Sequence, residues 1–128
     1  MNSYEISLDL DNKLILWTHT GTTIYRAETG SAWRTIISIE EFGKGWNILT
    51  DFRKSKFNFG IEDTKPIWEF FEIIRDDIDG KKQAVLSNDP NTIQTILCFQ
   101  QNIYRFFNFE VMFFQNKDKA IIWLKNGF

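Results

Sequence analysis

The two residue types that most often carry chemistry occur once each in this sequence. His19 ends an apolar stretch with no cysteine and no acidic cluster beside it, so a metal ligand or a general base is disfavoured there. Cys98 lies between Leu97 and Phe99, where a free cysteine typically behaves as a small buried apolar residue rather than as a nucleophile. We therefore expect no catalytic centre and no metal site.

A third candidate is the acidic run Asp76, Asp77 and Asp79. A calcium-binding loop needs a longer ladder of oxygen ligands that ends in glutamate, and position 88 is Asn88. We interpret the run as a solvated helix end, with a weak electrostatic docking point as the alternative. The sequence contains no phosphate loop, dinucleotide glycine fingerprint or nucleophile elbow, so no cofactor is expected.

Polar side chains follow two of the expected strands, which cover residues 46–52 and 83–87. In open α/β sheets, ligands bind beyond the carboxyl ends of parallel strands, and the next helix start adds affinity for anions. The candidate partner-binding or ligand-binding residues at this edge are Asp51, Arg53, Lys54, Ser55, Ser87 and Asn88. The alternative is that they are ordinary loop and cap residues.

Phe57 and Phe59 join that candidate set, because they lie in a segment where polar residues are the norm. In an extended chain their two rings point the same way. The interpretation we favour is that they fold over the end of the sheet and close the core. The alternative is an exposed aromatic anchor for a partner or for a second copy of the chain.

The elements that position these residues alternate along the chain. Apolar patterning predicts a hairpin from the first two strands and a helix after each later strand. The expected strands cover residues 4–9, 13–19, 46–52, 83–87 and 109–114. The expected helices cover 23–42 (one helix, with Gly30 as a candidate break), 64–78, a stretch from Asp89-Pro90, and a stretch after Asn116. This ββαβαβαβα order predicts one α/β domain over residues 1–128, with a five-stranded, mainly parallel mixed sheet and about four helices.

The composition of the chain disfavours some classes of partner and indicates a cellular compartment. The net charge of −2 leaves no basic footprint for nucleic acid, and no apolar run is long enough to span a membrane. The start of the sequence does not resemble a signal peptide, and a single cysteine suits a reducing compartment, so we expect a cytoplasmic protein. Aromatic residues reach 16%, which indicates either a ring-rich core or rings that serve a binding surface.

The element order and three stretches of sequence resemble the anti-sigma-factor antagonist (STAS) fold, and more closely its SpoIIAA-like branch of small bacterial proteins. The stretches are 47–53 (NILTDFR), 82–88 (KQAVLSN), and 111–114 (VMFF) with 119–124 (KAIIWL). The resemblance implies a non-enzymatic regulatory or protein-interaction domain that binds a protein partner or a second copy of itself.

One feature of that family is missing. Kinase-switched antagonists carry an Asp-Ser-Ser-Gly-type turn, which would fall near Phe59, Gly60 and Ile61, where no serine stands. Ser55 is close but does not match the motif, so we expect no phosphorylation switch at the antagonist position.

The alternative function is a small-molecule carrier for an apolar, lipid-like or anionic ligand. The SpoIIAA-like fold is also related to lipid-carrying CRAL-TRIO domains, and the excess of aromatic residues suits an apolar pocket. An enclosed apolar cavity would favour the carrier, and a closed core of rings would favour the interaction domain.

Overall fold

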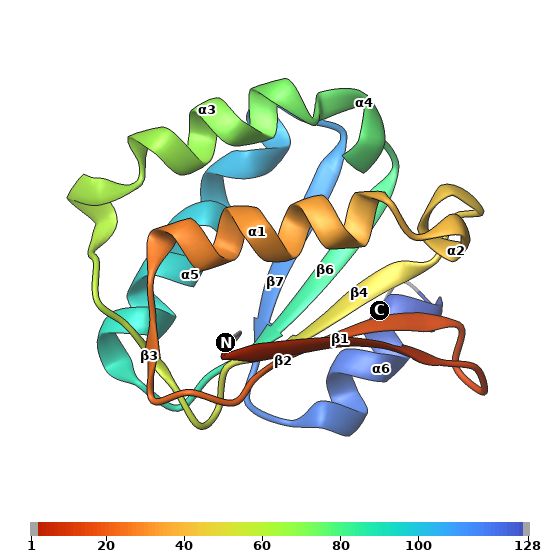
Figure 1. The fold of residues 1–128 in the computed structure, drawn as a ribbon, viewed down its shortest axis with the longest axis horizontal. Helices are drawn as coiled ribbons and strands as arrows, with labels where there is room; N and C mark the ends of the chain where they lie inside the picture. The colour runs from red at the N-terminus through yellow and green to blue at the C-terminus, as the bar shows by residue number, and fades with distance from the viewer. Residues whose placement is uncertain (1–2, 127–128) are drawn as a thin grey trace.

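A computed structural model describes residues 3–126 of the chain; residues 1, 2, 127 and 128, which the predicted domain includes, lie outside the described part. Its main sheet has five strands in the order β1-β2-β4-β6-β7, with β1 antiparallel to β2 and all other neighbours parallel (Figure 1). The strands are β1 (Tyr4–Asp9), β2 (Leu14–His19), β4 (Asn47–Asp51), β6 (Lys81–Leu86) and β7 (Phe109–Phe114). The prediction of a mixed, mainly parallel sheet is confirmed.

The helices cover the two faces of the sheet unequally (Figure 1). The parallel strands follow one another in chain order, and right-handed crossovers between strands in that order place every connecting helix on the same face. The helices are α1 (Arg26–Ile37), α2 (Glu40–Gly43), α3 (Lys65–Ile73), α4 (Arg75–Ile78), α5 (Pro90–Asn102) and α6 (Lys117–Asn126). Of these, α1, α3 and α5 lie on one face, and only α6 covers the other.

Adjacent residues of the central strands enter different cores. Ile48 packs under α1 and α3, whereas its neighbour Leu49 packs against α6; Val85 and Ala84 divide in the same way. Both faces are buried, which is why these strands read as continuous apolar runs rather than as alternating patterns. The larger core lies under α1, α3 and α5, and most of the buried aromatic rings belong to it.

The helix expected over residues 23–42 is wrong in its bounds, and the candidate break at Gly30 is absent. The chain first forms a two-residue strand, β3 (Thr23–Ile24), and then α1, which runs through Gly30 without a break. The break comes at Ile39, whose backbone is extended, after the Ser38 hydroxyl donates a hydrogen bond back to the Thr35 carbonyl at 2.6 Å. A side chain that bonds its own helix end competes with continuation of the helix.

Further short elements were missed. Strand β5 (Lys56–Phe57) pairs in parallel with β3, and a 3-10 turn, η1 (Ile61–Asp63), precedes α3. The helix expected over 64–78 is divided at Ile74 into α3 and α4, so the described residues form six α-helices rather than about four. A second 3-10 turn, η2 (Ile103–Arg105), follows α5.

Two helix starts were predicted correctly from local chemistry. Asp89 caps α5, with its Oδ2 accepting from the Thr92 backbone N–H at 3.0 Å, and Pro90 follows at the first helical position. Asn116 caps α6, with its Oδ1 accepting from the backbone N–H of Lys119 at 3.1 Å.

Candidate functional site

Three of the strand-end candidates come together beyond β4. Asp51 and Arg53 form an ion pair at 2.8 Å, and Asp51 Oδ1 also accepts from the Arg53 backbone N–H at 3.0 Å. Asn88 Nδ2 donates to the Arg53 carbonyl at 3.3 Å. Burial acts to raise the pKa of Asp51, but the hydrogen bonds and charge of Arg53 outweigh it and hold that pKa below its ordinary value. The two charges therefore satisfy each other.

The other strand-end candidates do not complete this group. Lys54 is exposed, the buried Ser55 hydroxyl donates to the Gly21 carbonyl, and Ser87 Oγ accepts from the Asp89 backbone N–H at 3.3 Å. The order of the parallel strands does not favour a crevice at this edge. Such a crevice opens where strand order reverses, and strands β2, β4, β6 and β7 run in chain order. Ligand binding by these residues stays a prediction.

Phe57 and Phe59 pack together at the end of the sheet. Their rings stack with centroids 4.5 Å apart, and Phe57 meets Phe52 edge to face at 5.5 Å. Phe59 is only 7% exposed and Phe57 is half-buried, which fits a closing wall rather than an exposed anchor. The shared ring direction expected from their spacing is present, and both rings line a cavity.

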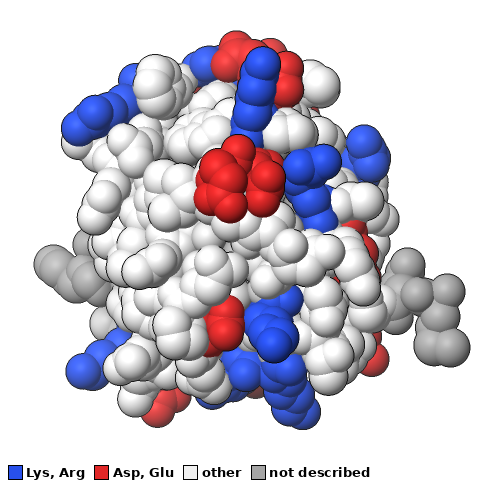
Figure 2. Space-filling model, turned by 90° about the vertical axis from the view of Figure 1, so that its left-hand side faces the viewer, with Lys and Arg blue, Asp and Glu red and all other residues white. Residues whose placement is uncertain are grey.

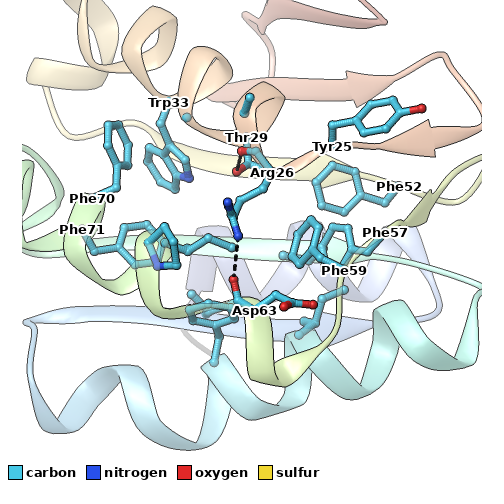
Figure 3. Close-up of a pocket in the computed structure, with 18 of the residues that line it drawn as sticks. Tyr25, Arg26, Thr29, Trp33, Phe52, Phe57, Phe59, Asp63, Phe70 and Phe71 are labelled. Carbon is cyan, nitrogen blue, oxygen red and sulfur yellow. Dashed lines mark hydrogen bonds between the residues drawn. The ribbon is translucent and has the colours of Figure 1, made fainter.

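The cavity lies between α1, α3 and the face of the sheet on the side of α1, α3 and α5, and it has a volume of about 690 Å³. Figure 3 shows two groups of rings facing each other across it, one around Trp33, Phe70 and Phe71 and one around Phe52, Phe57 and Phe59. The sheet supplies the floor. The lining residues on the floor include Trp17, Gln83, Val85 and Val111. The space is thus bounded mainly by aromatic and aliphatic side chains.

Helix α1 leaves room for this space through its sequence. Arg26, Gly30, Trp33 and Arg34 line the cavity and lie at i, i+4, i+7 and i+8, which places them along one side of a helix. A Cβ added at Gly30 would meet no atom closer than Arg34 Nη1 at 3.9 Å. Glycine in a helix interior costs roughly 1 kcal/mol relative to alanine, and here its missing side chain keeps the wall open.

The wall at Phe57 and Phe59 is hydrogen-bonded to the start of α5. The Phe57 backbone N–H donates to Thr92 Oγ1 at 2.9 Å, and Thr92 Oγ1 donates to the capping carboxylate of Asp89 at 2.9 Å. Asn91 Nδ2 donates to the Phe59 carbonyl at 3.2 Å. The cap that begins α5 therefore also fixes the aromatic end of the cavity.

Polar groups are few and occupy distinct places in the cavity. On the floor, Gln83 Nε2 donates to Thr50 Oγ1 at 2.9 Å, while the buried Trp17 Nε1 has no hydrogen-bond partner in the described residues. At the mouth, Arg26 Nη1 donates to the backbone carbonyl of Asp63 at 3.2 Å, which connects α1 with η1 (Figure 3). The Arg34 guanidinium lies over the Phe70 ring, 5.3 Å from its centroid.

The face of the molecule that forms the left-hand side of Figure 1 has mixed charge. Figure 2 shows acidic and basic side chains interspersed on a largely uncharged face, without a continuous basic patch there. Nucleic-acid-binding surfaces concentrate lysine and arginine on one face or along one helix.

Within residues 3–126, no helix is long and apolar enough to cross a membrane.

His19 and Cys98 lie outside the cavity lining. His19 is buried between Tyr4 and Phe52, at ring distances of 5.9 and 5.6 Å, and its Nε2 is 3.8 Å from Glu28 Oε1. Cys98 is half-buried on α5, where its sulfur lies 3.8 Å from Asn102 Nδ2. Neither residue faces the space that a small molecule could enter.

Most of this site was not predicted from the sequence. Phe57 and Phe59 were candidates, and the aromatic excess was a signal, but Trp17, Trp33 and Arg34 were not assigned to a site. The usable signal was the α1 pattern, where one glycine stands among arginine and tryptophan on a single helix side. Comparison with protein-family models, curated proteins and solved structures finds no match.

Proposed function

We propose that this protein is a small-molecule-binding domain whose site is the cavity between α1 and α3. The observation that carries the proposal is an aromatic-lined space of about 690 Å³ within the larger core. Small-molecule sites are typically concave, mainly apolar and about 300–1,000 Å³ in volume, with a few polar groups that orient the ligand. Gln83 on the floor and the arginines at the mouth are groups of that kind.

The family assignment is part of this proposal. The element order and the sheet support a STAS-like domain of the SpoIIAA-like branch, acting without a catalytic step of its own. Ser55 does not favour regulation by phosphorylation, because its hydroxyl is buried and hydrogen-bonded to the Gly21 carbonyl. A kinase would have to open that loop before it could reach the hydroxyl.

A protein-interaction domain is the second candidate, and one observation favours it. Ile73 at the end of α3 is 80% exposed, and Tyr104 and Phe106 near η2 are 62% and 59% exposed. Arg75 Nη1 donates to the Phe106 carbonyl at 2.6 Å, which holds the two segments together. Exposed apolar patches on soluble domains often mark interfaces. Replacing Ile73 and Phe106 with serine should abolish self-association in light scattering if the chain pairs through this patch.

The test of ligand binding uses phenylnaphthylamine, a neutral fluorescent probe for apolar sites. We expect saturable binding to the wild-type protein and a loss of at least roughly tenfold in affinity for Gly30→Leu, whose side chain would enter the cavity. The matched control is Thr35→Leu, which adds the same side chain at an exposed position of the same helix outside the lining. No binding to the wild type, or equal binding to both variants, would refute the proposed site.

A further inference from the structure

The cavity carries an imbalance of charge that the proposed function alone does not explain. Three charged residues line it, two arginines from α1 and Asp63 from η1. Asp63 forms no ion pair with either arginine, and its Oδ2 accepts from the Gly60 backbone N–H at 3.2 Å. Among residues 3–126, neither Arg26 nor Arg34 has a carboxylate within ion-pair distance.

Most N–H donors of the two arginines have no acceptor within the described residues. Arg26 makes one hydrogen bond, to the Asp63 carbonyl, and Arg34 rests on the Phe70 ring. A guanidinium offers five N–H donors in a planar fork that matches an acid group, so most donors of both residues remain free. Figure 3 shows Arg26 between the two groups of rings, where an acid group at the mouth would meet it.

The buried Trp17 Nε1 is a donor without a partner beneath the floor of the cavity, but it does not indicate a ligand. Trp17 is 2% exposed and lines the floor, and its N–H has no acceptor in the described residues. A buried donor without a partner is rare in folded proteins. The nitrogen itself has essentially no accessible surface, so it faces packed side chains rather than the open space, and the charge of the ligand is inferred from the arginines at the mouth.

We propose, resting on the small-molecule function above, that the ligand is an amphipathic organic acid. Its apolar body occupies the aromatic chamber, and its acid group binds the arginines at the mouth, Arg26 and Arg34. Arginine is suited to this role, because it stays charged and binds oxyanions through two parallel hydrogen bonds.

The test compares two probes that share one ring skeleton, the anionic anilinonaphthalene sulfonate and the neutral phenylnaphthylamine. We expect the sulfonate to bind the wild type more tightly than the neutral probe. Combined substitution of Arg26→Gln and Arg34→Gln should weaken the sulfonate by roughly tenfold to a hundredfold, the range for one or two charge-assisted hydrogen bonds, and leave the neutral probe within about twofold. Arg105→Gln, an exposed arginine outside this lining, removes one charge and should alter neither affinity.

The outcomes separate this inference from the proposed function. If the neutral probe binds as tightly as the sulfonate and the double variant binds both like the wild type, the organic-acid inference is overturned and the apolar site stands. If Arg105→Gln weakens the sulfonate as much as the double variant does, general charge rather than the mouth arginines is responsible, and the inference is again overturned. If neither probe binds the wild type, both proposals fail. Near-ultraviolet circular dichroism of each variant verifies that the core packing is retained.

Discussion

The rings of Trp33 and Phe71 meet edge to face, with centroids 5.8 Å apart and an interplanar angle of 85°. Trp33 belongs to α1 and Phe71 to α3, so the contact joins the two helices that form the walls of the cavity (Figure 3). Phe71 also contacts the rings of Phe99 and Phe109, each at 6.0 Å. This cluster therefore sets the separation of the two helices at one end of the site.

Phe71→Ala should lower the free energy of unfolding by about 3–5 kcal/mol, because it removes a buried ring from a packed cluster. The matched control is Ile73→Ala on the same helix, which is exposed and should change stability by no more than about 0.5 kcal/mol. Urea unfolding followed by tryptophan fluorescence measures both variants. A loss below about 1 kcal/mol for Phe71→Ala would mean that the buried side of α3 is wrongly assigned.

Gly30→Ala should stabilise the protein by roughly 0.5–1 kcal/mol. Alanine is the better helix former, and its methyl group would enter open space, since the nearest atom is 3.9 Å away. The thermal midpoint of the ligand-free protein is the measurement. Gly43→Ala, at the end of the four-residue helix α2, is the comparison and should gain less. Destabilisation by Gly30→Ala would show that the wall is already closed at this point.

Thr92→Val should cost about 1–3 kcal/mol, because the change leaves the Phe57 backbone N–H without its acceptor. Thr95→Val is the control on the same helix. Thr95 is equally buried, but its hydroxyl donates only to the Asn91 carbonyl one turn earlier, so its loss leaves no donor without a partner. Equal losses in the two variants, measured by urea unfolding, would show that the bond to Phe57 is not what matters.

Stability should fall as the pH drops below about 6.5, and His19 is the cause. Burial lowers the pKa of His19, and the Glu28 carboxylate opposes that effect only in part. The unfolded chain therefore binds the imidazole proton more readily than the folded protein. The contribution is fully present above about pH 6.5 and is lost as the pH falls from there toward the lowered folded-state pKa.

This window can be assigned to one residue, because His19 is the only histidine in the chain. The carboxylates with lowered pKa values, among them Glu28 and Asp51, change the stability of the protein only below about pH 4.5. Urea midpoints measured at about pH 7.5 and about pH 5.5 should differ in the wild type and converge in His19→Gln. An unchanged difference in His19→Gln would rule out the histidine as its source.

The bounds of an element are predicted best from the sequence where nearby residues alone determine them. Strand β7 was expected over 109–114 and has those bounds, because its aromatic and β-branched run fits no other element. The start of α5 followed from Asp89 and Pro90 alone. Strands β3 and β5 have two residues each, too few for any periodicity, and they form only because the two segments meet in space.

The candidate site was harder to predict, because the cavity is a property of several elements together. Phe57 and Phe59 attracted attention as aromatic residues in a polar segment. Gly30 was considered only as a candidate break in a helix, whereas in the structure it is a helical residue whose missing side chain opens the wall. Local sequence rules cannot state what lies opposite a glycine, since that depends on how α3 packs against α1.

The central claim is that a small molecule occupies the cavity between α1 and α3, and the indole N–H groups report on it most directly. Trp17 and Trp33 line the cavity, whereas Trp46 and Trp123 lie outside its lining. Their indole signals are observed separately in a proton–nitrogen correlation spectrum during titration with phenylnaphthylamine. We predict saturable shifts for Trp17 and Trp33 with Trp46 and Trp123 unchanged. Shifts confined to Trp46 or Trp123, or no shift at Trp17 and Trp33 at saturating probe, would contradict the claim.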